Sequence, residues 1–176
     1  MRKVLLFLNM VFLMGCGCFS NMATIGNKEY IGHALLMPKH IGISIYNNYY
    51  KEKVIDYAIN DTVKESYPLV AIVNIKDSLA EVALYYPLEN KEQYGWIEIK
   101  HLGIHLAFDS ESLNVMSQPD LCSEVSFKIE NPQWGDYYPV IDAYNGWLYI
   151  QNIYNPKEFG WLAPSNQCNN PYTTCC

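Results

Sequence analysis

From about residue 41 onward, the chain consists of short runs rich in β-branched and aromatic residues, separated by turn residues. The runs lie at 42–46, 53–59, 67–75, 79–88, 95–108, 112–120, 124–129, 137–144, 146–153 and 159–164. Asn145-Gly146, between two of them, is typical of a type I′ hairpin, because that turn needs positive φ at both central positions. Outside the apolar run at 4–15, no stretch keeps a helical period for three turns. We therefore predict an all-β fold of small barrels or sandwiches.

The N-terminus has the pattern of a secretory signal. Two basic residues precede the apolar run at 4–15, which is too short to cross a bilayer. The following Leu13-Met14-Gly15-Cys16 resembles a bacterial lipobox, which implies a signal peptide at 1–15 and lipidation of Cys16. Ordinary cleavage nearby, for instance after Ser20, is the alternative. We expect an exported lipoprotein anchored to a membrane of the bacterial envelope, or a periplasmic or secreted protein if Cys16 is not lipidated.

The charge balance bears on the class of partner. The sequence has 12 Lys and Arg against 18 Asp and Glu, and loss of residues 1–15 removes two of the basic residues. The chain has no basic cluster of the kind that follows a phosphate backbone, so we do not expect it to bind nucleic acid. Half of the residues are hydrophobic, which is enough for a packed core.

Four cysteines follow the signal region and are candidates for disulfide bonds in an oxidising compartment: Cys122, Cys168, Cys175 and Cys176. The Asn-Pro turn signal between Cys168 and Cys175 can bring those two thiols together. Adjacent cysteines are hard to join to each other, so Cys175 and Cys176 are expected to have different partners, one of which can be Cys122. We predict no metal site here, because the spacing lacks a second CxxC pair and a nearby His.

Two motifs in the second half of the chain occur in the order found in bacterial SH3 (SH3b) domains. The first is the strand Leu113-Asn114-Val115-Met116-Ser117-Gln118-Pro119-Asp120, in which Met116 replaces the Arg usual in the family. The second is the hairpin Asn145-Gly146-Trp147-Leu148-Tyr149-Ile150, followed by Gly160-Trp161-Leu162. Residues 113–164 thus resemble an SH3b domain.

Residues 41–108 resemble a diverged second copy of the same domain. Gly95-Trp96-Ile97 matches the hairpin motif, and Gly103-Ile104 stands where the returning Gly-Trp would be expected. The resemblance implies two tandem small SH3-like barrels. The implied division is a lead-in at 16–40, a diverged repeat at 41–108, an SH3b-like domain at 109–166 and a Cys-containing tail at 167–176.

The SH3b-like segment at 113–164 is also unusually aromatic for a fifty-residue core. Alternation along a strand puts Trp147 and Tyr149 on one face, with Leu148 and Ile150 on the other. If the aliphatic face is core, the aromatic face lines a surface, and such surfaces bind peptides or glycans. The alternative is that the rings belong to the core or to an interface between the repeats. The candidate ligand-binding residues are Trp134, Tyr138, Trp147, Tyr149 and Trp161.

The SH3b resemblance implies non-catalytic binding of cell-wall peptide or another extended peptide. The alternative is an inhibitor or immunity-type lipoprotein that binds a secreted enzyme. No cysteine lies near a His as a nucleophile would, so we expect no enzyme activity and no cofactor. His101 and His105 would be about 13 Å apart on a strand, too far to share a metal ion.

Overall fold

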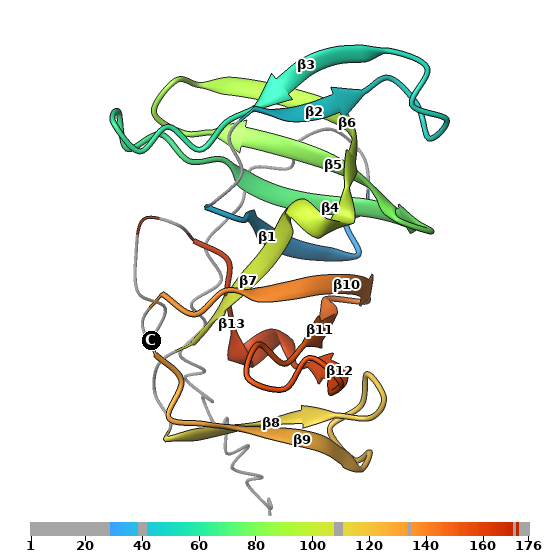
Figure 1. Cartoon of the computed structure of the whole chain (residues 1–176), viewed down its shortest axis with the longest axis vertical. Helices are drawn as coiled ribbons and strands as arrows, with labels where there is room; N and C mark the ends of the chain where they lie inside the picture. Colours follow the sequence, from blue (N-terminus) through green and yellow to red (C-terminus); the bar gives the residue numbers. More distant parts are fainter. Residues whose placement is uncertain (1–28, 39–41, 108–110, 134, 171, 173–176) are drawn as a thin grey trace, which may run out of the picture.

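The computed structural model describes residues 29–38, 42–107, 111–133, 135–170 and 172 (Figure 1). These residues form strands and two short 3-10 turns, and they contain no α-helix. The prediction of an all-β protein is confirmed. No helix in the described part of the chain is long and apolar enough to cross a membrane.

The strands of the first half come before the first 3-10 turn. They are β1 (Gly32–Leu36), β2 (Ile43–Tyr46), β3 (Val54–Ala58), β4 (Leu69–Lys76), β5 (Leu79–Tyr86) and β6 (Lys91–Glu98), followed by η1 (Ile99–His101) and β7 (Leu102–Leu106). The second half contains β8 (Ser112–Met116), β9 (Val125–Glu130), β10 (Tyr138–Tyr144), β11 (Trp147–Gln151), β12 (Phe159–Leu162), η2 (Pro164–Asn166) and β13 (Gln167–Cys168).

The hydrogen-bonded strands form one path, in the order β3-β2-β6-β5-β4-β1-β7-β10-β11-β12-β8-β9, and every pairing is antiparallel. β13 lies off this path and pairs with β7. The path ends at β3 and β9, so the described strands form one large open sheet rather than two separately closed barrels. The two halves are continuous because β7 pairs with β1 of the first half and with β10 of the second (Figure 1).

The same pairing pattern occurs in both halves. In the first, β4-β5-β6 form a meander, the β2–β3 hairpin joins it through β6, and β1 lies along β4. In the second, β10-β11-β12 form the meander, the β8–β9 hairpin joins it through β12, and β7 lies along β10. Each meander is followed by a 3-10 turn and a strand that pairs with the first strand of its half. β7 therefore serves as the last strand of one half and the first of the next.

Register shifts mark corresponding places in the two halves. They lie between Ile72 and Asn74 and between Val140 and Asp142 in the meanders, and between Ile45 and Tyr46 and between Val115 and Met116 in the hairpins. A shift of this kind adds twist and bends a strand, which is how a short sheet is made to curve. The recurrence shows that the halves share their irregularities as well as their strand order.

The correspondence between the strands of the two halves differs from the alignment of the two copies that the sequence motifs suggested. Trp96 lies on β6 and pairs with Tyr46 of β2, just as Trp161 lies on β12 and pairs with Met116 of β8. The Gly95-Trp96 pair is thus the counterpart of Gly160-Trp161, not of the hairpin at 145–150. The first half also uses β1, which lies in the segment expected to be a lead-in.

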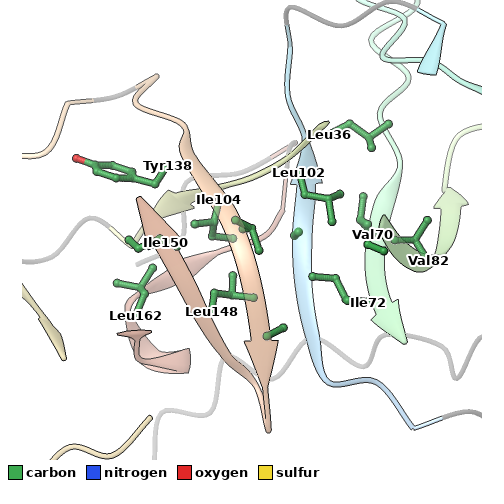
Figure 2. Close-up of a cluster of buried hydrophobic side chains, with 14 of the residues drawn as sticks. Leu36, Val70, Ile72, Val82, Leu102, Ile104, Tyr138, Leu148, Ile150 and Leu162 are labelled. Carbon is green, nitrogen blue, oxygen red and sulfur yellow. The ribbon is translucent and has the colours of Figure 1, made fainter. Parts of the chain in front are cut away.

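The core runs without a break from one half to the other. A single cluster of buried side chains includes Val70 and Ile72 of β4, Ile104 of β7 and Leu148 of β11. Figure 2 shows these side chains facing one another across β1 and β10, with Tyr138 at the second-half end of the group. Each Å² of apolar surface removed from water contributes about 25 cal/mol of stabilising free energy. Burial in this shared core is therefore the main force that holds the two halves together.

The chain near its C-terminal end returns to the first half. The Tyr172 hydroxyl accepts a hydrogen bond from the Tyr67 N–H and donates one to the Tyr67 carbonyl oxygen, each at 2.7 Å. The two rings also meet edge to face, with centroids 5.6 Å apart. One phenol thereby satisfies both backbone groups of Tyr67, just before β4 begins.

Candidate ligand-binding surface

Strands β11 and β12 have two different faces. Leu148, Ile150 and Leu162 are fully buried in the shared core. The intervening Trp147, Tyr149 and Trp161 are only partly buried, on the opposite face. This alternation confirms that the aliphatic side of β11 is core, as the sequence pattern predicted.

The two rings at the centre of the outer face are direct cross-strand neighbours. Tyr149 pairs with Trp161, and their ring centroids lie 5.2 Å apart with the planes tilted by 48°. Phe159 continues the row, with its ring nearly parallel to Tyr149 at 6.2 Å. Offset and tilted arrangements at these distances are the favourable ones for aromatic pairs.

The row extends to the neighbouring strand β10. Tyr144 is 55% exposed and pairs with Trp147 across the Asn145-Gly146 turn. Both turn residues have positive φ, 47° and 85°, as expected for the predicted hairpin. We call the set the β11–β12 aromatic surface; it consists of Tyr144, Trp147, Tyr149, Phe159 and Trp161.

Close strand packing positions Trp161. A Cβ atom at Gly160 would lie 2.8 Å from the Met116 carbonyl oxygen and 2.8 Å from Val115 Cγ1. Glycine therefore lets β12 approach β8 closely where Trp161 turns outward. Beside Tyr149, the cross-strand neighbour on β10 is the exposed Asp142, which places a carboxylate at the edge of the rings.

Tyr138 does not belong to this surface, and its prediction as a ligand-binding residue is wrong. Its side chain is completely buried in the core beside Val140, because both face inward from β10 (Figure 2). Its hydroxyl has no hydrogen-bond partner among the described residues, and burial raises the pKa of the phenol. The fifth candidate, Trp134, lies outside the described residues.

Tyr144 and Phe159 are the two members of the surface that were not among the five predicted ligand-binding residues. The signal was present, because Phe159 and Trp161 are two residues apart on one strand and so share a face. The Gly160-Trp161 motif contains the glycine and the residue after it, but it does not include Phe159, the residue before it.

The histidines of the β6–β7 region are dispersed. His101 lies in η1, whereas His105 is buried on β7 with Nδ1 2.8 Å from the Asp136 carbonyl oxygen. The His105 ring packs against Tyr137, with centroids 3.8 Å apart and the planes tilted by 49°, and burial lowers the His105 pKa. Among the described residues, no group of three or more His, Cys, Asp or Glu side chains is placed to hold a metal ion.

The cysteines within the described ranges differ in state. Cys122 is an exposed free thiol in the β8–β9 connection, so its prediction as a disulfide partner is wrong. Cys168 is buried on β13 and disulfide-bonded, with its partner outside the described residues. Cys175 and Cys176 also lie outside the described residues, so the pairing of Cys168 with Cys175 stays a prediction. The proposed lipidation site Cys16 also lies outside the described residues.

Comparison with protein-family models and with curated proteins finds no match for this chain. The resemblance to SH3b domains stays a prediction from the two sequence motifs.

Proposed function

We propose that this protein is a non-catalytic binding protein of the bacterial cell envelope, built from two SH3b-like units that share a strand. The support for the units is the repeated order of hairpin, meander, 3-10 turn and closing strand. The register shifts in the hairpin and the meander of each half would let each unit curl towards an SH3-like barrel.

The observation that carries the binding proposal is the Tyr149–Trp161 pair. The two rings lie together on the face opposite the buried Ile150 and Leu162, so the core does not cover that side. Partly exposed aromatic rows supply a large contact area at low entropic cost, because each side chain has few rotatable bonds.

The proposed ligand is an extended peptide of the cell wall. A flat row of rings across two strands suits a chain that lies along the sheet, and polar tips on Tyr144 and Tyr149 can bond to its backbone. Asp142 at the edge of Tyr149 can accept a hydrogen bond from an N–H group of the peptide. Lipidation of Cys16 would hold the protein at the membrane, next to such a ligand.

The test is retention by intact cell-wall sacculi. We expect the unaltered protein to sediment with sacculi, and a Trp147→Ala, Trp161→Ala double variant that still unfolds cooperatively to remain in solution. Tyr57→Ala is the matched control, because Tyr57 is also an exposed aromatic residue, 52% exposed, but lies on the far edge strand β3. Its retention should equal that of the unaltered protein.

Absence of retention for the unaltered protein would overturn wall binding. It would favour the alternative of an envelope inhibitor that binds a secreted enzyme. Mass spectrometry of the mature N-terminus tests the anchor, because an unmodified N-terminus after cleavage would exclude lipidation at Cys16.

A further inference from the structure

The first half has an aromatic surface of its own at the position that corresponds to Trp161. Trp96 is partly exposed on β6, between Tyr46 on β2 and Glu81 on β5. In the second half the residue that corresponds to Glu81 is Tyr149, since both stand opposite the Trp. The corresponding place thus has a carboxylate beside the indole instead of a second ring.

The β2–β3 connection adds two more rings. Tyr49 meets Trp96 edge to face at 5.7 Å, and Tyr50 meets Tyr49 in the same way at 5.4 Å. The Asn48 side chain holds this turn by accepting a hydrogen bond from the Tyr50 N–H at 3.0 Å. Tyr50 is 76% exposed, so the row runs from the sheet out into solvent.

A cation already lies on this row. The Lys76 ammonium is 4.0 Å from the centroid of the Tyr49 ring, well within cation–π range. The Tyr49 hydroxyl donates a hydrogen bond to the Asp77 carboxylate. That bond increases electron density on the ring and makes its face a better partner for a positive charge.

A second lysine makes the same kind of contact with Tyr46, the neighbour of Trp96 on β2. The Lys51 ammonium lies 2.6 Å from a Glu98 carboxylate oxygen and 5.6 Å from the Tyr46 ring centroid. Tyrosine rings therefore lie beside Trp96 and already receive ammonium groups of the chain itself, Lys51 over Tyr46 and Lys76 over Tyr49. This is the chemistry by which proteins recognise amines.

We propose that the surface formed by Tyr46, Tyr49, Tyr50 and Trp96 is a second binding site, which takes the ammonium group of a lysine-like side chain on an extended peptide. The incoming ammonium replaces Lys76 over Tyr49, and the aliphatic stem of the ligand lies against Trp96. Lys76 is exposed and lies at the end of β4, so it can move aside without disturbing the core. The site does not depend on peptide binding by the β11–β12 aromatic surface.

The test is an NMR titration that follows the indole N–H of Trp96. The probe is the capped peptide acetyl-Gly-Lys-Gly-amide, and its matched control replaces Lys with norleucine, which has nearly the same stem but no ammonium. We expect the lysine peptide to shift the Trp96 signal and the norleucine peptide to leave it unchanged. An equal shift with both peptides would overturn the proposal.

Two variants sharpen the result. Lys76→Met removes the competing ammonium, so it should tighten binding of the lysine peptide about two- to fivefold. Tyr49→Leu should abolish the Trp96 shift. Lys128→Met is the control, because Lys128 is also an exposed lysine but lies in the second half, where its ammonium is 3.1 Å from a Glu130 carboxylate oxygen. Unchanged or weaker binding by Lys76→Met would contradict the proposal even if Tyr49→Leu failed to fold.

Discussion

Gly95 and Gly160 occupy corresponding positions in the two halves, and each lies where its strand passes very close to a neighbouring one. A Cβ at Gly95 would lie 2.5 Å from Ile45 Cγ2 and 2.7 Å from the Tyr46 carbonyl oxygen. A Cβ at Gly160 would lie 2.8 Å from the Met116 carbonyl oxygen. The close approach joins each hairpin to its meander, and it sets the outward direction of the Trp that follows.

Alanine at either glycine should therefore destabilise the fold. A methyl group restricts the unfolded chain, which favours folding by about 0.4–1 kcal/mol. The clash with backbone atoms cannot be relieved by a side-chain rotation, and such overpacking costs about 1–3 kcal/mol. We expect a net loss of about 1–2 kcal/mol for Gly95→Ala and for Gly160→Ala, measured by urea unfolding.

The control for these two variants is Ser78→Ala, in the exposed turn between β4 and β5. It should change the free energy of unfolding by less than about 0.5 kcal/mol. If the two glycine variants were as stable as this control, the close strand approach would be contradicted in both halves.

Tyr138→Phe should stabilise the protein. The Tyr138 hydroxyl is fully buried and finds no partner in the part of the chain that the structure describes, and an unsatisfied buried polar group costs about 1–3 kcal/mol. Its removal leaves the ring packing intact, so we expect a gain of about 1 kcal/mol in thermal or urea unfolding, with no change in retention by sacculi. A loss of stability would show that the hydroxyl has a partner, such as a buried water molecule.

The two faces of β11–β12 should respond differently to truncation. Ile150→Ala removes a fully buried side chain and should cost about 2–5 kcal/mol. Trp161→Ala removes a larger side chain that is only partly buried, and we expect a cost of about 1–2 kcal/mol in the same urea assay. A greater loss for Trp161→Ala than for Ile150→Ala would place the indole in the core.

Acid should weaken the fold through Glu98. Contacts with Lys100 and Lys51 lower the pKa of Glu98 to about 2, below its value in the unfolded chain. The unfolded chain therefore takes up the proton first as the pH falls, and the stabilisation is lost between about pH 4.5 and pH 2. Screening of such a surface pair by solvent limits the effect to about 1 kcal/mol.

The measurement is urea unfolding at pH 5 and at pH 2.5 for the unaltered protein and Glu98→Gln, which cannot titrate. The unaltered protein should lose about 1 kcal/mol more than the variant over this interval. Equal losses would show that the ion pairs of Glu98 contribute nothing to stability.

Local patterns predicted the local features of this fold well. The Asn145-Gly146 turn and the two faces of β11 follow from positive-φ preference and from two-residue alternation, which depend only on neighbouring residues. The same reasoning failed for Tyr138. In the run at 137–144, the register shift between Val140 and Asp142 breaks the alternation, so the run does not show which aromatic side chain turns inward.

The pairing of strands that lie far apart in the chain could not be predicted from the sequence. The run at 32–36 is short and lacks a two-residue period, yet it forms β1 because β4 and β7 supply partners on both edges. In the second half, Gly146-Trp147 lies at the start of β11, the middle strand of the meander, and Gly160-Trp161 lies within β12, the third strand. Because the motif is the same at both places, the sequence alone matched Gly95 with Gly146 instead of Gly160. The shared use of β7 appears only when both halves are placed together.

The central claim is that the β11–β12 aromatic surface holds an extended wall peptide, and an NMR titration of the indole N–H signals tests it most directly. The ligand is a soluble wall peptide released from sacculi and acetylated on its amines, so that it cannot use the ammonium site at Trp96. We expect the signals of Trp147 and Trp161 to shift while that of Trp96 stays in place. Unmoved Trp147 and Trp161 signals at saturating peptide would contradict it.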